Sequence, residues 1–280
     1  MDTEIPTYTL NDGTSLPAIA LGTYNLRGSG GVDAVVSALH VGYRLIDSAF
    51  NYENEGLVGE AVRRAGVPRD ELRLVSKLPG RHHRYEEAVY TVEESLYRAG
   101  LDYWDLYLVH WPNPRIGLYV EAFQALVDLR ERGLIRSVGV SNFLPEHLHR
   151  VIDEVGVTPS VNQIQVLPTW PQEDMVALDR DLGIRTEAWS PIGRGGEVVG
   201  DPVVTRIAGE VGRTPVQVIL RWHVQRGVVP LPKSANPGRQ AQNLDVFDFE
   251  LTDAQMAALT GMARPDGRAL DIDPSDHEEF

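Results

Sequence analysis

The feature that most constrains this chain is a regular alternation of short apolar runs with longer amphipathic stretches. Eight runs are typical of extended strands, at residues 18–22, 44–48, 72–77, 105–111, 135–141, 160–165, 184–190 and 228–233. Stretches with apolar residues at helical spacing lie between them, at 32–41, 55–65, 85–99, 118–132, 145–155, 171–182 and 214–225, with another after Pro237. Eight strand-then-helix units with short connections favour a (β/α)8 barrel over an open doubly wound sheet, which usually has fewer strands.

The length of 280 residues agrees with one barrel domain, because such barrels commonly occupy about 250 residues. We therefore predict an α/β fold with a single TIM-barrel domain over residues 1–280. The turn residues Asn11, Asp12 and Gly13 predict a short N-terminal β-hairpin before it. Residues 271–280 are acidic and poor in apolar side chains, so we expect a mobile C-terminal tail or a loop lying over one barrel face.

Charge and composition limit the classes of partner that the chain can bind. The formal net charge is -14, from 26 Lys and Arg against 40 Asp and Glu, which argues against nucleic acid and anionic membranes. Any bound phosphate must meet a local basic site. The chain has no cysteine, so disulfides and thiolate chemistry are excluded. The N-terminus lacks the basic and apolar regions of a signal peptide, and no apolar run reaches the roughly 18 residues of a membrane span, so we expect a cytoplasmic protein.

A barrel predicts where catalytic side chains lie, because its active sites gather at the C-terminal ends of the strands. Polar or aromatic residues stand at or beside seven of the predicted ends: Asp47, Ser76, Lys77, His110, Ser141, Asn142, Gln163, Gln165, Trp189, Ser190, Lys233 and Ser234. Tyr52 follows Asp47, at the end of the second predicted strand, by five residues.

Asp47, Tyr52, Lys77 and His110 would converge on one side of the barrel mouth, since their strands are neighbours. A phenol is a weak acid with a pKa of about 10, but a nearby ammonium can lower that value by roughly 1 to 3 units. Asp47 would keep Lys77 charged, and His110 would donate a hydrogen bond to a substrate carbonyl or to Tyr52. Such a site suits proton donation to a developing alkoxide during carbonyl reduction, with the hydride supplied by a cofactor.

Each of these residues alone has a simpler explanation. His110 could be a packed strand histidine, Lys77 a surface strand end, and Asp47 the N-cap of the next turn. Only their joint placement favours catalysis. A metal-dependent barrel hydrolase is a second possibility, but the pair His82 and His83 has adjacent rather than alternating spacing, and we expect it to face solvent. No metal site is predicted.

A second constellation lies in residues 230–243. Lys233, Ser234, Asn236 and Arg239 fall in or beside a loop entering a helix, where backbone N–H groups and the helix dipole favour phosphate. The alternative is a solvated basic turn. No G-x-G-x-x-G follows a strand, which disfavours a Rossmann dinucleotide site.

Several motifs carry a resemblance to a known family. In order they are "GYRLIDSAFNYENEGLVGEAV", "LVSKL", "DLYLVHWP", "IRSVGVSNF", "NQIQ", "AWSPIGRGG" and "PLPKSANPGRQAQN". Over nearly its whole length the chain resembles the aldo-keto reductase superfamily, most of all the bacterial 2,5-diketo-D-gluconate reductase-like branch. The resemblance implies a (β/α)8 barrel that binds NADPH without a Rossmann fold.

The same resemblance implies roles for individual residues. It makes Asp47, Tyr52, Lys77 and His110 the catalytic tetrad, with Tyr52 as proton donor. It implies a cofactor site formed by Gly22, Thr23, Asp47, Ser141, Asn142, Gln163, Trp189, Ser190, Pro191, Gly193, Lys233, Ser234, Asn236, Arg239, Gln242 and Asn243. Within that set Ser141, Asn142 and Gln163 would pair with the nicotinamide carboxamide, whose two ends suit hydroxyl and amide partners.

The remaining cofactor roles follow in the same way. Trp189 would stack on the nicotinamide, although alone it could be a core aromatic. The planar fork of Arg239 suits a 2′-phosphate, which favours NADP(H) over NAD(H). The glycine-rich segment 194–202 would close over the pyrophosphate, with a plain flexible connection as the alternative.

The substrate pocket implied by the resemblance contains Tyr24, Tyr52, His110, Trp111 and Asn113, with the tail around Leu270. Its mixture of aromatic and polar surface suggests small polyhydroxylated or dicarbonyl compounds. We therefore predict NADPH-dependent reduction of aldehydes or ketones by a monomer. The alternative is a nucleotide-sensing binding module that acts on a partner protein. Two observations argue against it: the tetrad is complete, and no extra interaction domain is visible in the sequence.

Overall fold

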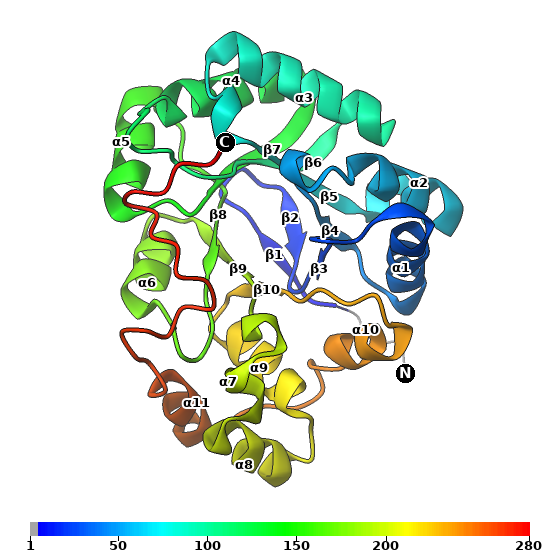
Figure 1. Ribbon diagram of the computed structural model, residues 1–280, viewed down its shortest axis with the longest axis vertical. Helices are drawn as coiled ribbons and strands as arrows, with labels where there is room; N and C mark the ends of the chain where they lie inside the picture. The colour runs from blue at the N-terminus through cyan, green and yellow to red at the C-terminus, as the bar shows by residue number, and fades with distance from the viewer. Residues whose placement is uncertain (1–4) are drawn as a thin grey trace.

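The computed structural model describes residues 5–280 and contains a ring of parallel strands surrounded by helices (Figure 1). The barrel strands are β3 (Leu21–Gly22), β4 (Leu45–Asp47), β5 (Arg73–Leu78), β6 (Trp104–Val109), β7 (Ile135–Ser141), β8 (Val161–Gln165), β9 (Arg185–Trp189) and β10 (Val229–Leu231). Each pairs in parallel with the next in chain order. The Ala20 N–H group donates to Pro230 O and the Gly22 N–H group to Pro232 O, both over 3.1 Å. These bonds join the first strand of the barrel to the last. The predicted barrel is confirmed.

The helices cover the outside of this ring. They are α1 (Gly28–Val41), α2 (Glu55–Ala65), α3 (Tyr85–Ala99), α4 (Tyr119–Glu131), α5 (Pro145–Val155), α6 (Glu173–Asp181), α7 (Glu197–Gly200), α8 (Pro202–Val211), α9 (Pro215–Gln225), α10 (Pro237–Leu244) and α11 (Asp253–Thr260). The eight predicted helices are present. The helices α7, α8 and α11 were not predicted, and α7 with the turn η4 (Gly193–Gly195) replaces the expected loop at 194–202. Within residues 5–280, none of the helices has the length and apolarity to cross a membrane.

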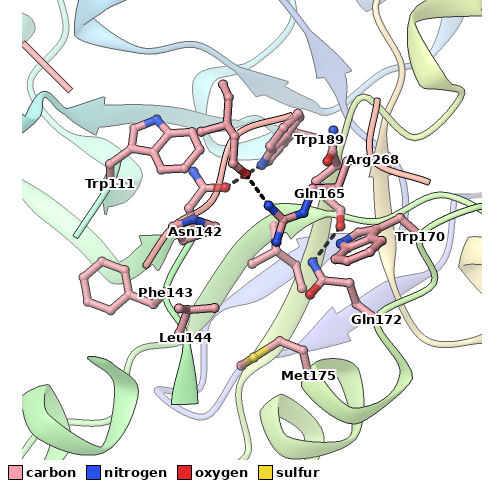
Figure 2. A pocket seen from close by; sticks show the side chains of 13 residues that line it. Trp111, Asn142, Phe143, Leu144, Gln165, Trp170, Gln172, Met175, Trp189 and Arg268 are labelled. Carbon is pink, nitrogen blue, oxygen red and sulfur yellow. Dashed lines mark hydrogen bonds between the residues drawn. The ribbon is translucent and has the colours of Figure 1, made fainter. Parts of the chain in front are cut away.

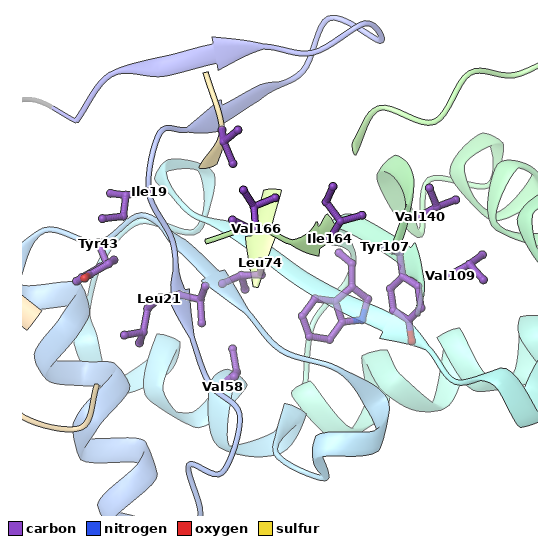
Figure 3. Packing of buried hydrophobic residues seen from close by; sticks show 14 of the residues in the cluster. Ile19, Leu21, Tyr43, Val58, Leu74, Tyr107, Val109, Val140, Ile164 and Val166 are labelled. Carbon is purple, nitrogen blue, oxygen red and sulfur yellow. The ribbon is translucent and has the colours of Figure 1, made fainter. Parts of the chain in front are cut away.

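The period of two along each strand separates two hydrophobic layers. On β5 and β6, Leu74, Tyr107 and Val109 belong to the large cluster shared with the helices. Figure 3 shows members of this outer layer, among them Leu74 and Val109 on strands and Val58 on α2. The alternate residues fill the barrel interior, and they are Leu45, Val75, Leu106, Leu108, Val161, Val229 and Leu231.

The N-terminal hairpin closes the end of the barrel opposite to the strand C-termini. Strands β1 (Thr7–Thr9) and β2 (Ser15–Pro17) pair antiparallel, with Tyr8 opposite Leu16. Gly13 adopts a φ of 84°, and the Asp12 carboxylate accepts from Thr14 N–H, as the turn chemistry predicted. Leu10 and Leu16 join the interior cluster, so the hairpin seals the floor and leaves the other end as the mouth.

The chain after α11 crosses that mouth. In Figure 1 the red segment passes α6 and ends near the C-terminal ends of the strands. Thr169, between β8 and α6, donates to Gly267 O over 2.7 Å, and Asn113, after β6, donates to Glu279 O over 2.9 Å. Of the two possibilities for the C-terminal end, the loop over a barrel face is the one that the structure contains.

Candidate active site

The same alternation that fills the barrel interior brings polar side chains to its mouth. On β4, β5 and β8 the interior residues Leu45, Val75 and Val161 are each followed two positions later by a polar residue. Because side chains two apart in a strand share a face, these polar residues point into the barrel at its C-terminal end. They are Asp47, Lys77 and Gln163, and His110 follows Leu108 at the end of β6 in the same way.

Asp47 and Lys77 form a buried ion pair. Lys77 Nζ lies 2.7 Å and 2.8 Å from the two carboxylate oxygens of Asp47, and 2.7 Å from Ser48 O. The Lys77 side chain is fully buried, so it is not a surface strand end. Burial alone lowers the pKa of Lys77, but the charge of Asp47 and its hydrogen bond to the ammonium outweigh it and raise that pKa, which keeps the ammonium charged. Asp47 binds this ammonium and does not cap the following turn η1 (Phe50–Tyr52).

Tyr52 lies beside this pair at the end of η1. The Lys77 ammonium is 5.1 Å from the centre of the Tyr52 ring. The sequence predicted a lowered phenol pKa, and this prediction is wrong. Burial raises the pKa of Tyr52 to about 12, with Asp47 and Glu279 adding to the rise, and the opposing effect of Lys77 is smaller. Tyr52 therefore holds its proton at neutral pH.

His110 completes the predicted tetrad from the neighbouring strand. Its ring meets the Tyr52 ring edge-on, with centroids 5.9 Å apart. Its Nδ1 lies 2.8 Å from a carboxylate oxygen of Glu279 in the C-terminal tail, a close contact without the alignment of a hydrogen bond. All four tetrad residues thus gather at one place. Glu279 was missed because only the fold brings residue 279 to the mouth.

The expectation that His82 and His83 both face solvent is wrong for His83. That side chain is buried, and its burial lowers its pKa to about 4. His82 is half-buried and contacts the Thr91 hydroxyl through Nδ1 at 2.8 Å. Within the described residues, no three side chains of His, Cys, Asp or Glu form a potential metal site.

The three predicted carboxamide partners lie side by side on β7, its following residue and β8. Asn142 Nδ2 donates to Ser141 Oγ and to His110 O, both at 3.0 Å. Ser141 Oγ in turn donates to Gln163 O over 2.8 Å. Trp189 Nε1, from β9, donates to Asn142 Oδ1 over 2.8 Å, as Figure 2 shows. The ring of Trp189 is therefore held at the mouth and is not a core aromatic.

A second carboxylate that the sequence did not indicate lies below these residues. Glu187 on β9 is fully buried, and Gln163 Nε2 bridges it to Asp47 over 2.7 Å and 2.9 Å. Burial, together with the nearby Asp47 charge, raises the pKa of Glu187 to about 8. Glu187 is therefore mostly neutral at pH 7. Glu187 lies two residues before Trp189 on the same strand. The alternation of side chains along the strand could therefore have predicted that Glu187 points into the barrel.

The predicted phosphate loop leads into α10. Asn236 caps the helix by accepting from Arg239 N–H over 3.0 Å, and Ser234 Oγ accepts from Asn236 N–H over 3.1 Å. Lys233 and Arg239 are exposed, and neither forms an ion pair with a carboxylate within residues 5–280. Gln242 is also exposed, whereas Asn243 is buried beside Tyr43.

The other predicted cofactor residues are parts of the loops around the mouth. Thr23, next to Gly22, is buried and donates through Oγ1 to Asp47 O over 2.8 Å. A side chain at Gly22 would meet Leu231 O at 3.1 Å, which explains glycine where the first and last strands approach. Ser190 has a φ of 49°, a left-handed conformation that non-glycine residues adopt rarely and mostly at functional sites. Pro191 and Gly193 follow it and enter the turn η4.

The predicted substrate residues flank the tetrad. Tyr24 is 47% exposed and meets Tyr52 edge-on at 5.2 Å. Trp111 packs against tail residue His277 at 4.4 Å, and Asn113 bonds to the tail backbone. Trp111 and Phe143 line one side of a small cavity of about 30 Å³, and Trp170 and Arg268 the other (Figure 2). Ligand pockets usually measure roughly 300–1,000 Å³, so a substrate on this side requires the tail to shift.

Comparisons with known proteins agree with this geometry. A model of the aldo/keto reductase family matches residues 18–198 and 200–264. The chain is 52% identical over 276 residues to 2,5-diketo-D-gluconic acid reductase B of Corynebacterium sp. (strain SHS752001), covering 99% of each. A solved Bombyx mori aldo-keto reductase in complex with NADP is 38% identical, with a TM-score of 0.89 and 96% of each chain covered. A variant of Gox0644 in complex with NADPH is 39% identical, with a TM-score of 0.93, covering 98% of this chain and 99% of that one.

Proposed function

Because the chain belongs to the aldo/keto reductase family and is an NADP-dependent oxidoreductase, we propose that it reduces aldehydes or ketones to alcohols with Tyr52 as the proton donor. The observation that carries the proposal is the buried ion pair of Lys77 with Asp47 beneath the Tyr52 ring. Burying an ion pair costs desolvation energy, and buried titratable groups with shifted pKa values cluster at functional sites.

The residues at the mouth and at α10 fit NADP(H). Lys233 and Arg239 are exposed cations at a helix N-terminus in a chain of net charge -14, and they would hold the 2′-phosphate. Ser141 and Asn142 stand next to Trp189, where they would hold the carboxamide against its ring. The bound cofactor supplies the hydride.

The chain's own residues donate the proton and stabilise the charge that remains on the donor. Tyr52 is protonated at neutral pH because its pKa is raised to about 12 by burial, so a proton is available when charge develops on the carbonyl oxygen. The phenolate left behind lies against the Lys77 ammonium, which lowers the free energy of that charged state. Asp47 holds the ammonium in place through both of its oxygens.

We further propose small dicarbonyl or sugar-derived carbonyl compounds as substrates. The exposed ring of Tyr24 and the indole of Trp111 offer aromatic walls beside the polar tetrad. The Corynebacterium relative is named for its action on 2,5-diketo-D-gluconic acid. Action as a cytoplasmic monomer and the single-domain organisation over residues 1–280 stay predictions.

Tyr52→Phe tests the proton-donor role. The variant should lose roughly 10²–10⁴-fold in kcat for NADPH oxidation by a panel of aldehydes and diketones, because it removes the acid and little else. NADPH binding, measured by cofactor fluorescence, should be unchanged. Tyr97→Phe, at an 80% exposed position on α3, is the matched control and should keep full activity. Substantial turnover by Tyr52→Phe would contradict the assignment of Tyr52 as the proton donor. If the wild type binds NADPH but reduces none of the carbonyl compounds, the nucleotide-sensing module is favoured instead.

Arg239→Ala tests the phosphate assignment. Loss of a charge-assisted contact of about 1.5–3 kcal/mol should raise the Kd for NADPH about 10- to 100-fold and leave the Kd for NADH unchanged. Arg206→Ala is the matched control, because Arg206 is also an exposed helical arginine but pairs with Glu210 on α8. Equal weakening of NADPH and NADH would contradict a 2′-phosphate contact.

A further inference from the structure

The C-terminal tail, residues 267–280, reaches deep into the barrel mouth. Glu278 Oε1 accepts from Arg115 N–H over 2.7 Å, which fixes the tail close to its end. The backbone of Glu279 is then paired twice with the Asn113 side chain, as donor over 3.1 Å and as acceptor over 2.9 Å. These two bonds fix how far the Glu279 side chain reaches into the mouth and the direction in which it points.

The Glu279 carboxylate contacts three loops of the mouth. Oε1 accepts from Asn51 Nδ2 over 2.8 Å, after β4, and Oε2 accepts from Gly80 N–H over 2.9 Å, after β5. The loop after β6 contributes His110, whose Nδ1 is 2.8 Å from Oε1. Arg81 donates to Asn51 Oδ1 and so turns the Asn51 amide N–H group toward the carboxylate. The side chain is only 13% exposed.

Glu279 is charged in this position. Burial alone raises the pKa of Glu279, but its close contact with His110 and the hydrogen bonds from Gly80 N–H and Asn51 lower it to about 2. The other titratable groups facing this corner are Tyr52, which is protonated, and His83, which burial keeps neutral with a pKa of about 4. A carboxylate can only accept hydrogen bonds, so it favours a proton on Nδ1 of His110.

We propose that Glu279 is a positioning residue for His110, holding the Nδ1 side of its ring so that Nε2 is the nitrogen presented to Tyr52 and the substrate carbonyl. The inference rests on the proposed carbonyl reduction and adds a residue to it. The tail, which lies across the mouth, thus supplies a functional group to the active site in addition to covering it. Histidines that bind metals are held in a similar way. A carboxylate commonly contacts one imidazole nitrogen, which fixes the tautomer and the direction in which the other nitrogen points.

Glu279→Gln is the discriminating substitution. It keeps the size of the side chain and removes the carboxylate, so His110 Nδ1 no longer faces an anionic acceptor. The preference for the Nδ1–H form should weaken, so the share of the Nε2–H tautomer of the neutral ring should rise, measured by ¹⁵N chemical shifts of histidine-labelled protein at alkaline pH. Glu278→Gln is the matched control and should leave the His110 shifts unchanged, since its amide oxygen can still accept from Arg115.

Kinetics give the second measurement. The kcat of Glu279→Gln should fall about tenfold, a part of the roughly 10²–10⁴-fold effect of a positioned acid–base group, with KM for the carbonyl changing much less. Glu279→Ala should lose as much and recover part of its kcat on addition of acetate, which a packing defect would not do. An unchanged His110 tautomer in Glu279→Gln, or an unchanged kcat in an active enzyme, would overturn the proposal. If the wild type reduces no carbonyl, the proposed function fails, and the tautomer measurement alone decides the role of Glu279.

Discussion

The ion pair between Asp47 and Lys77 permits a stability measurement that separates its role in folding from its role in catalysis. All three N–H groups of the Lys77 ammonium are used, two by Asp47 and one by Ser48 O, and the two side chains are 0% and 6% exposed. Lys77→Met leaves the Asp47 carboxylate buried with Gln163 Nε2 as its remaining side-chain partner. Removing one partner of a buried pair costs about 3–5 kcal/mol, because an uncompensated charge stays behind.

The double variant Asp47→Asn, Lys77→Met should be much more stable than the two single effects predict. A neutral amide beside a thioether leaves no buried charge, so its unfolding free energy should lie within roughly 2 kcal/mol of the wild type. If each single substitution costs about 3–5 kcal/mol, the coupling energy between the two positions is at least about 4 kcal/mol.

Urea unfolding at neutral pH, followed by far-UV circular dichroism, measures these values, with equal m-values required for the comparison. Both single variants and the double variant should be catalytically inactive, because none of them retains the ammonium and carboxylate beneath Tyr52. A stable double variant without activity would show that the pair is kept for chemistry and not for folding. Additive destabilisation in the double variant would refute the account of the pair as a compensated buried charge.

Two further predictions follow from buried positions elsewhere. The pKa of Glu187 is raised from 4.5 to about 8, so the folded chain retains a proton that the unfolded chain loses, and stability falls as pH rises through this window. Glu187→Gln should gain roughly 2–4 kcal/mol in unfolding free energy relative to wild type between about pH 5 and pH 9, and a pH-independent difference would contradict the assigned pKa. Gly59→Ala on α2 would place its Cβ 1.7 Å from Ala99 O, whereas a Cβ at Gly209 on α8 meets nothing within 4 Å. In thermal unfolding the first should destabilise by at least about 1–3 kcal/mol and the second should stabilise by roughly 0.5–1 kcal/mol; equal effects would contradict the close approach of α2 and α3.

The sequence predicted the barrel and its mouth well because both depend on local periodicity. The period of two that makes Val75 an interior residue also directs Lys77 inward two positions later, and the same holds for Leu108 and His110. The missed helices also had local signals. Asp201 with Pro202 is an N-cap followed by proline, and Thr252 opens a capping box with α11.

What the sequence could not indicate depends on contacts between distant residues. Glu279 is 166 positions from Asn113 and 228 from Asn51, and nothing in "DHEEF" predicts contact with either. The direction of the Tyr52 pKa shift was wrong for a related reason. A motif shows that an ammonium is near, but the larger effect is loss of contact with water, which depends on how the folded chain surrounds the ring.

The charges at the mouth connect the tail to the proton step. Lys77 lowers the pKa of Tyr52, and Asp47 and Glu279 both raise it, so two carboxylates oppose one ammonium beside the phenol. Proton donation adds a third negative charge to this corner. Lys77 is the group placed to offset that charge, because its ammonium lies 5.1 Å from the centre of the Tyr52 ring. The tail therefore has two effects on the groups beside the substrate oxygen: its carboxylate makes Tyr52 a weaker acid, and it holds the Nδ1 side of the His110 ring that lies next to Tyr52.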